Sequence, residues 1–318
     1  MSVELVLHAV QSVLTLFILG GAGYVLARAG WFSADSKALL PRLVTLVALP
    51  PYMIYNITGS MTRQELLDMF YGSAVPFISI FSVFGLSLFL ARLIKPKPGR
   101  RGIFCTSFAA SNTVFIGLPV NVALFGSEAL PYVLLYYFAN TLFFWTVGNY
   151  MLAADGKGPK PAIVSLSSLK QVFSPPLLGL FTGVGLVLAG LKLPPFLNSA
   201  AMHLGSLTTP LALMIIGITL QSMKLRQIKL DRDLLLIFFG RFILSPLSII
   251  LLSRLFPMPE LMFKVFVMQA SLPVVVSVGL LSSYYKSDVE FGTVAVSATT
   301  LAAMLTIPVY MLIVTFLV

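Results

Sequence analysis

Apolar segments long enough to cross a lipid bilayer recur along almost the whole chain. A helix needs roughly 20 apolar residues to cross a hydrocarbon core of about 30 Å. Hydropathy predicts ten such helices, at residues 3–28, 38–57, 66–94, 101–124, 129–153, 174–191, 197–223, 233–256, 261–286 and 289–317. The composition agrees, since 58% of the 318 residues are hydrophobic and only 10% are charged. The sequence therefore predicts an all-α polytopic membrane protein.

The two ends of the chain and its basic residues predict an orientation. The first segment begins at Val3 with no Lys or Arg before it, so we expect it to remain in the mature protein. Sixteen basic residues lie on one side of the predicted membrane, and four, Arg63, Lys192, Arg254 and Lys264, lie on the other. By the positive-inside rule the sixteen face the cytoplasm, which places both termini outside the cell membrane. Because these charges are dispersed over loops, the net charge of +10 does not indicate nucleic acid as a partner.

The fourth apolar segment contains residues that interrupt helices. It reads Ser111-Asn112-Thr113-Val114-Phe115-Ile116-Gly117-Leu118-Pro119 at its middle, and the ninth segment reads Ser271-Leu272-Pro273. Proline lacks an N–H group and clashes with the preceding turn, while glycine and asparagine tolerate non-helical dihedral angles. We therefore expect both helices to be broken within the bilayer, where exposed backbone must line a cavity or lie buried in protein. The alternative is an ordinary proline kink.

Positions 160 residues apart indicate an internal repeat. This shift aligns Ala110-Ser111 with Ala270-Ser271, and it superposes two successive helices, the hairpin between them and the break in the first. Five helices per half is an odd number, so the second half enters the membrane in the opposite orientation. We expect two inverted five-helix repeats, at residues 1–153 and 174–318, joined by a cytoplasmic linker at 154–173.

The two breaks predict a site for an anion. Helices broken near the midplane bring the N-terminal ends of their second halves, with unpaired N–H groups and partial positive charge, toward one point. The candidate binding residues at the breaks are Ser111, Asn112, Thr113, Gly117, Pro119, Ser271, Pro273 and Ser277. Asn112 could instead make an interhelical hydrogen bond that holds the bundle together.

Three polar residues outside the breaks are further candidates. Arg241 lies about 10 Å into the eighth segment, and it either attracts an anionic substrate or snorkels to the cytoplasmic headgroups. Asn140 and Thr300 are equivalent under the shift of 160 residues. They either line the site or make hydrogen bonds in the core.

The remaining polar residues weigh against an enzyme and against cation coupling. All eleven acidic residues fall in loops or near predicted helix ends, and the two histidines, His8 and His203, are far apart. The chain therefore offers no nucleophile paired with a base and no central carboxylate for a proton relay. With Cys105 as its one cysteine it has no disulfide or cysteine cluster, and no cofactor or metal is expected.

The motif from Ser111 to Pro119 resembles that of the auxin efflux carrier family, which includes bacterial members described as malonate or malate permeases. Supporting matches are Leu49-Pro50, Leu272-Pro273 and Thr299-Thr300, and the resemblance covers essentially the whole chain. It implies a scaffold of helices 1, 2, 6 and 7 that forms a homodimer, and a transport domain of helices 3–5 and 8–10. It also implies that helices 4 and 9 cross beside a bound carboxylate, and that the transport domain moves by an elevator-like step.

This chain departs from the family pattern at two places. Many members carry asparagine four residues after the helix 9 proline, where this chain has Ser277, whose hydroxyl lacks the amide's two donors. The long cytoplasmic loop of the plant auxin exporters is also missing. We therefore expect a secondary transporter for small organic anions, either mono- or dicarboxylates or auxin-like aromatic acids. A sodium-coupled organic-anion symporter of the bile-acid type and an anion channel are the alternatives.

Overall fold

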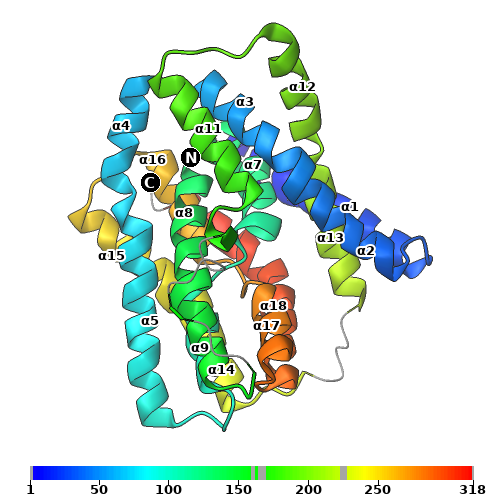
Figure 1. Ribbon diagram of the computed structural model, residues 1–318, viewed down its shortest axis with the longest axis vertical. Coiled ribbons are helices and arrows are strands. Elements are labelled where there is room, and N and C mark those ends of the chain that lie inside the picture. Colours follow the sequence, from blue (N-terminus) through cyan, green and yellow to red (C-terminus); the bar gives the residue numbers. More distant parts are fainter. Residues whose placement is uncertain (1–2, 159–161, 164–169, 223–227, 317–318) are drawn as a thin grey trace. The chain divides into compact units, whose positions relative to one another are not determined.

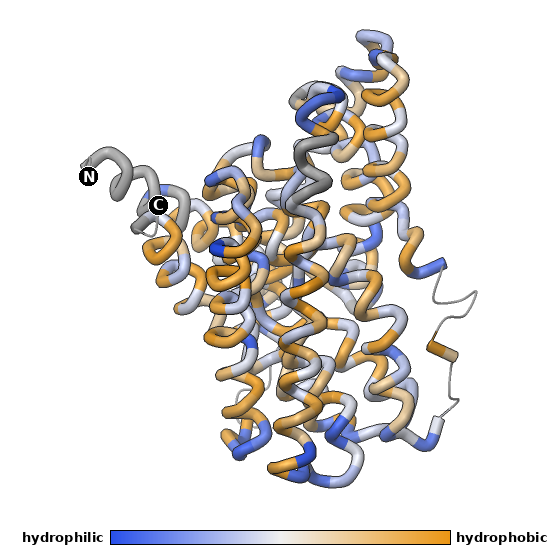
Figure 2. Tube along the Cα trace, turned by 90° about the vertical axis from the view of Figure 1, so that its left-hand side faces the viewer, coloured by the Kyte–Doolittle hydropathy of each residue, from blue (hydrophilic) through white to orange (hydrophobic). Residues whose placement is uncertain are grey.

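The computed structural model describes residues 3–158, 162–163, 170–222 and 228–316. Every regular element in these ranges is a helix, apart from one isolated β-bridge, which confirms the all-α prediction. Six of the helices described there are long and apolar enough to cross a membrane, at Asp35–Gly59, Ala74–Ile94, Ser127–Ala154, Pro195–Ser222, Arg232–Leu255 and Val289–Thr315. Figure 2 shows hydrophobic residues along most of each helix, with hydrophilic residues gathered near the ends.

The chain divides into two compact units. Unit 1 comprises Met1–Gly72, Val114–Leu134 and Phe173–Ser222, and unit 2 comprises Ser73–Thr113, Leu135–Val172 and Met223–Val318. Each unit therefore combines segments from both halves of the sequence. Part of the predicted linker 154–173 lies outside the described residues, which omit 159–161 and 164–169.

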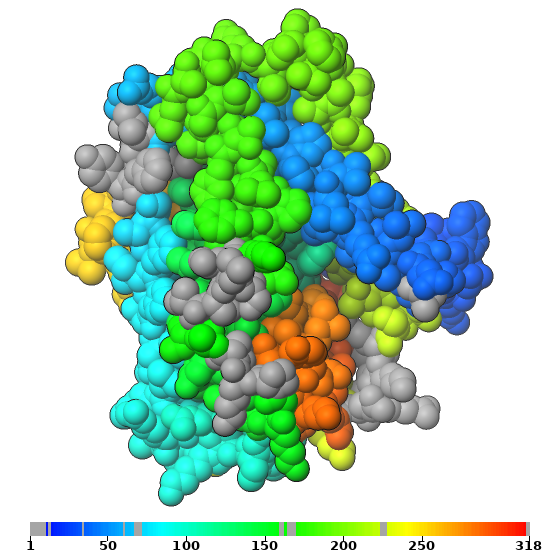
Figure 3. Space-filling view, viewed as in Figure 1, coloured from blue at the N-terminus to red at the C-terminus, as the bar shows by residue number. Residues whose placement is uncertain are grey.

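Unit 1 contains several long helices and a number of shorter ones (Figure 1). Its elements are α1 (Val3–Arg28), α2 (Ala34–Arg42), η1 (Leu43–Ala48), α3 (Leu49–Ser60), α4 (Arg63–Gly72), α7 (Leu118–Phe125), η3 (Ser127–Ala129), α11 (Pro175–Leu188), α12 (Pro195–Ser206) and α13 (Thr208–Ser222). Helix α3 packs against α11 and α12, and α1 packs along α13. Figure 3 shows α3 in blue and α11 in green in direct contact on one face.

The contact between α1 and α13 requires glycine. A Cβ atom on Gly23 would lie 2.2 Å from the carbonyl oxygen of Met214, and one on Gly217 would lie 1.8 Å from that of Gly20. Real atoms do not approach so closely, so the two backbones are in contact without intervening side chains. This contact fixes the separation of the first and seventh apolar segments.

Unit 2 contains the remaining helices. Its elements are α5 (Ala74–Ile94), α6 (Arg101–Ala109), most of α8 (Leu130–Phe143), η4 (Phe144–Gly148), α9 (Asn149–Ala154), α14 (Arg232–Phe239), η6 (Gly240–Leu244), α15 (Ser245–Leu255), α16 (Glu260–Ala270), α17 (Ser277–Tyr285) and α18 (Val289–Phe316). The π-helical turn η2 (Thr113–Gly117) is divided between the units: Thr113 belongs to unit 2, and its other residues belong to unit 1. Helix α5 packs against α6 and α15, and α17 packs against α18 (Figure 1).

Three π-helical segments precede a proline by two residues. Segment η1 ends at Ala48 before Pro50, η2 ends at Gly117 before Pro119, and η6 ends at Leu244 before Pro246. A proline removes one backbone donor and crowds the carbonyl of the preceding turn, and the wider π turn relieves both conflicts. These prolines therefore lie inside continuous helices.

Both helix interruptions predicted from the sequence are present. Helix α6 ends at Ala109 and the next turn begins at Thr113, while α16 ends at Ala270 and α17 begins at Ser277. The first break lies several residues before Pro119, which occupies the first turn of α7 and is compatible with a helix there. Pro273, in contrast, lies inside its break.

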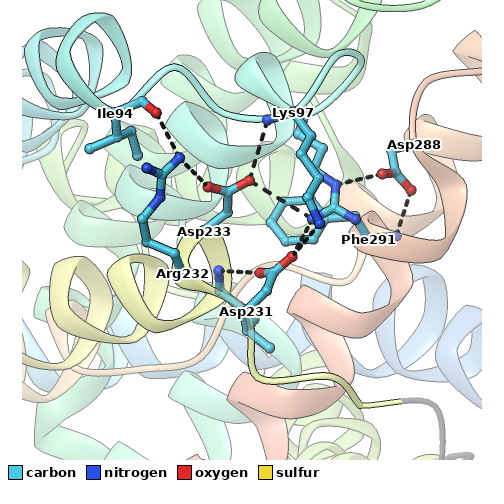
Figure 4. Close-up of polar contacts among 9 residues, drawn as sticks. Ile94, Lys97, Asp231, Arg232, Asp233, Asp288 and Phe291 are labelled. Carbon is cyan, nitrogen blue, oxygen red and sulfur yellow. Dashed lines mark hydrogen bonds and ion pairs between the residues drawn. The ribbon is translucent and has the colours of Figure 1, made fainter.

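A cluster of charged residues joins three helix starts at one end of unit 2 (Figure 4). Arg100 donates to Asp288 at 2.6 Å and to Asp231 at 2.5 Å, and its guanidinium lies 4.2 Å from the ring centroid of Phe291. The same carboxylates also cap helices: Asp231 accepts from the Leu234 N–H at 3.1 Å, and Asp288 accepts from the Phe291 N–H at 2.9 Å. The cluster thus fastens the segment before α6 to the starts of α14 and α18.

Candidate anion site at the helix breaks

The two breaks are joined through their backbones. Ser111 and Val274 form an isolated antiparallel bridge. The Asn112 N–H donates to the Pro273 carbonyl at 2.9 Å, and the Val275 N–H donates to the carbonyl of Ala110 at 3.4 Å. Backbone polar groups freed from a helix need partners when they are buried. Each break therefore supplies partners to the other, and both breaks belong to unit 2.

Side chains from two neighbouring helices hold the breaks in place. Asn140 of α8 accepts from the Ser111 N–H and donates to the Ser111 carbonyl, both at 2.9 Å. Thr299 of α18 accepts from the Val274 N–H at 3.1 Å. Its neighbour Thr300 instead donates to the Val296 carbonyl within its own helix, at 2.8 Å. The sequence left open whether Asn140 lines the site or makes hydrogen bonds in the core. The structure shows that it makes hydrogen bonds in the core.

Arg241 lies at the ends of both first half-helices. Its side chain is fully buried, so it does not snorkel toward the headgroups. Four of its five N–H groups donate to carbonyl oxygens: those of Phe108 at 3.1 Å, Ala109 at 2.8 Å, Ala270 at 2.7 Å and Leu272 at 3.2 Å. Ala109 is the last residue of α6 and Ala270 is the last residue of α16. The guanidinium therefore caps two helix C-termini at once.

Asn112 and Thr113 lie directly after the first break. Each is 3% exposed, and neither side chain has a hydrogen-bond partner among the residues that the structure describes. Beside them, Gln269 donates through Nε2 to the Thr113 carbonyl at 3.5 Å, whereas its own Oε1 is buried and unpaired in the described part of the chain. The second half-helices start at Thr113 and Ser277, directly after the two breaks.

Comparisons with known proteins agree with this architecture. The sequence profile of the membrane transport protein family matches residues 8–311. The chain belongs to this family. As a member of the membrane transport protein family, which is the auxin efflux carrier family that the sequence motif resembles, it is a multi-pass membrane transporter and not an enzyme.

Several transporters of this family match over nearly their whole length. An uncharacterised transporter of Methanocaldococcus jannaschii is 26% identical over 303 residues, which cover 94% of this chain and 96% of that protein. A protein of Rhizobium meliloti, named as a candidate malonate transporter, is 25% identical over 301 residues, with 93% and 92% covered. An uncharacterised transporter of Escherichia coli is 22% identical over 311 residues, with 95% and 96% covered.

The other predicted site residues of this transporter have structural contacts of their own. Ser271 is fully buried and donates to the Met268 carbonyl at 2.9 Å, and Ser277 is a half-buried first residue of α17. Gly117 accepts from Asn121 at 2.7 Å within the segment assigned to unit 1, where Pro119 also lies. Within unit 2 the structure brings together Ser111, Asn112, Thr113, Asn140, Arg241 and Pro273.

Sequence reasoning missed three residues of this region, namely Tyr136, Gln269 and Thr299. Tyr136 is fully buried, and its hydroxyl lies beside Ser111, Ser245 and Arg241. It precedes Asn140 by four residues, so the two share a face of α8, which is a signal the sequence contains. Gln269 was also detectable, as an amide in an apolar stretch just before the second break.

Proposed function

We propose that this transporter carries small organic anions and binds their carboxylate group beside the paired breaks. The observation that supports the proposal is Asn112, a side-chain amide that is 3% exposed and has no hydrogen-bond partner among the described residues. This amide is free to donate through its Nδ2 to a ligand, and a hydrogen bond to a charged acceptor is stronger than one to a neutral acceptor. The Thr113 hydroxyl and the partial positive charge at the start of α17 add to the attraction of the same anion.

The substrate class follows from these donors. A carboxylate accepts several hydrogen bonds and carries the charge that helix N-termini favour. We propose mono- and dicarboxylates such as malonate or malate, with auxin-like aromatic acids as further members of the class. The name of the Rhizobium meliloti relative is consistent with this class.

Movement of the substrate is proposed to follow an elevator step. The paired breaks and the side chains that hold them belong to unit 2, while α1, α3, α7, α11, α12 and α13 belong to unit 1. This division supports a moving unit 2 that carries the site and a unit 1 that acts as scaffold and forms a homodimer. We propose that the ten apolar segments form two inverted repeats in the cell membrane, with both termini outside and lipid around unit 1.

The test is counterflow of radiolabelled malonate and benzoate in proteoliposomes. We expect saturable uptake that is accelerated by unlabelled anion inside the vesicles. Asn112→Ala should reduce this uptake at least about tenfold, since a hydrogen bond to a charged group contributes about 1.5–3 kcal/mol. Asn198→Ala, which changes a half-buried asparagine of α12, is the matched control and should leave uptake unchanged.

Three results would contradict the proposal. Equal uptake by wild type and Asn112→Ala at equal protein content would remove Asn112 from the site. Uptake that stops when sodium is replaced by potassium would favour the sodium-coupled symporter. Flux that neither saturates nor shows counterflow would favour an anion channel.

A further inference from the structure

We infer that Arg241 sets the charge selectivity of the anion site without touching the anion. This inference rests on the proposed function, and it assigns to Arg241 a role that neither snorkelling nor direct binding describes. Its basis is one buried cation that contacts two of the four helix ends at the breaks.

Two of these helix ends would repel an anion. Helices α6 and α16 end at Ala109 and Ala270, and a helix C-terminus carries about half a negative charge. Ala109 precedes Asn112 by three residues, so this negative end lies within about 11 Å of the Cα atom of Asn112. Without compensation, the carbonyl groups at the breaks would oppose a carboxylate at the same point where the N-termini attract it.

Arg241 removes this opposition. Its N–H groups donate to the carbonyls of Ala109 and Ala270 at 2.8 and 2.7 Å, and two further bonds reach Phe108 and Leu272. One positive charge matches the two half charges of the C-termini. The start of α17 at Ser277, in the same unit, then keeps its partial positive charge.

The guanidinium has no carboxylate partner in the described part of the chain. Among the residues that the structure describes, the ion pairs do not include Arg241, and its guanidinium donates to the backbone carbonyls of Phe108, Ala109, Ala270 and Leu272. A buried arginine paired with an acidic residue would add no net charge to the site. Arg241 therefore contributes its full charge to the region of the breaks.

The test separates charge from hydrogen bonding with two variants of Arg241. Arg241→Gln removes the charge, and Arg241→Lys keeps it while losing the planar fork that reaches four carbonyls. Arg92→Gln, at an exposed arginine of α5, is the control. The measurements are KM and maximal rate for benzoate counterflow, the ratio of benzoate to benzamide binding, and thermal stability in detergent.

We expect Arg241→Gln to raise KM for benzoate about tenfold, because a unit charge about 10 Å away at an effective dielectric constant of about 20 has that effect. The preference for benzoate over benzamide should fall by the same factor. Arg241→Lys should keep KM within about threefold and lose thermal stability, since its ammonium satisfies fewer carbonyls.

Two outcomes would overturn the inference. A folded Arg241→Gln protein with the KM and benzamide discrimination of the wild type would show that the charge is not used. If Arg241→Gln does not fold, a tenfold rise in KM for Arg241→Lys would show that hydrogen-bond geometry decides, and not charge. Absence of benzoate counterflow in the wild type would instead contradict the proposed function.

Discussion

Asn140 pairs with both backbone groups of Ser111, accepting from its N–H and donating to its carbonyl, each at 2.9 Å. A side-chain amide has the same donor and acceptor as a peptide group, so Asn140 replaces a neighbouring strand at a point where the helix is open. One residue thereby satisfies the two polar groups that the break exposes.

Replacing Asn140 should destabilise the protein strongly. Asn140→Ala leaves two buried backbone groups unpaired, and each costs about 1 to 3 kcal/mol, so we expect a loss of about 2 to 6 kcal/mol. The measurement is the thermal unfolding midpoint in detergent. Asn198→Ala is the control, and an equal midpoint for both variants would show that the pairing with Ser111 contributes nothing.

Placing a negative charge at Asn112 should block anion transport without unfolding the protein. Asn112→Asp keeps the size of the side chain but puts a carboxylate beside the carboxylate of the substrate, and we expect uptake to fall more than about 100-fold near neutral pH. Protonation makes the aspartate neutral, so uptake should recover in part as the pH is lowered. Uptake at the wild-type level near neutral pH would place the anion elsewhere.

The glycine contact between α1 and α13 predicts opposite effects at two neighbouring positions. Gly23→Ala places a methyl group against the backbone of Met214 and should cost about 1 to 3 kcal/mol. Gly21 is exposed, and nothing lies within 4 Å of a Cβ there, so Gly21→Ala should stabilise the helix by about 0.5 to 1 kcal/mol. Thermal unfolding of the two variants measures the difference, and a loss at both positions would refute the close contact.

The charged cluster around Arg100 predicts a loss of stability in acid. Burial raises the pKa of Asp231, but the Leu234 N–H, Arg100 and Lys97 outweigh it and hold that pKa below its ordinary value of 3.8. A carboxylate with a lowered pKa contributes stability that is complete above 3.8 and is lost as the pH falls below that value. We therefore expect the wild-type unfolding midpoint to fall in this range.

Removing Arg100 tests the origin of that pH dependence. Arg100→Gln should lower the midpoint near neutral pH and reduce the drop on acidification, because the carboxylates of Asp231 and Asp288 lose their shared partner. Arg92→Gln serves as the control, since Arg92 is exposed. An unchanged acid profile in Arg100→Gln would assign the effect to other carboxylates.

The positions of the breaks were readable from residue type, but their contacts were not. Serine, asparagine and proline in an apolar segment predict an open helix, and the structure has one at 110–112 and another at 271–276. Which carbonyls Arg241 would meet depends on two segments about 160 residues apart in the chain, and local pattern carries no information about such a meeting. The sequence therefore identified Arg241 as unusual without revealing its partners.

The sequence also did not predict which residue of the last helix contacts its break. The repeat aligned Asn140 with Thr300, whereas Thr299 is the residue that contacts its break, through Val274. A shift of one residue turns a side chain by about 100° around the helix, since 3.6 residues complete a turn. Weak internal similarity does not fix an alignment to that accuracy. The sequence therefore identified the correct helix but pointed to Thr300 in place of its neighbour Thr299.

The bridge between Ser111 and Val274 is made by main-chain atoms. Its geometry is therefore independent of which side chains occupy positions 110–112, 274 and 275, provided that they fit the space. Under the proposed function, substrate preference can change at those positions by point substitution while the backbone that presents them stays intact. A directed-evolution library restricted to these five codons should accordingly yield folded carriers with altered cargo.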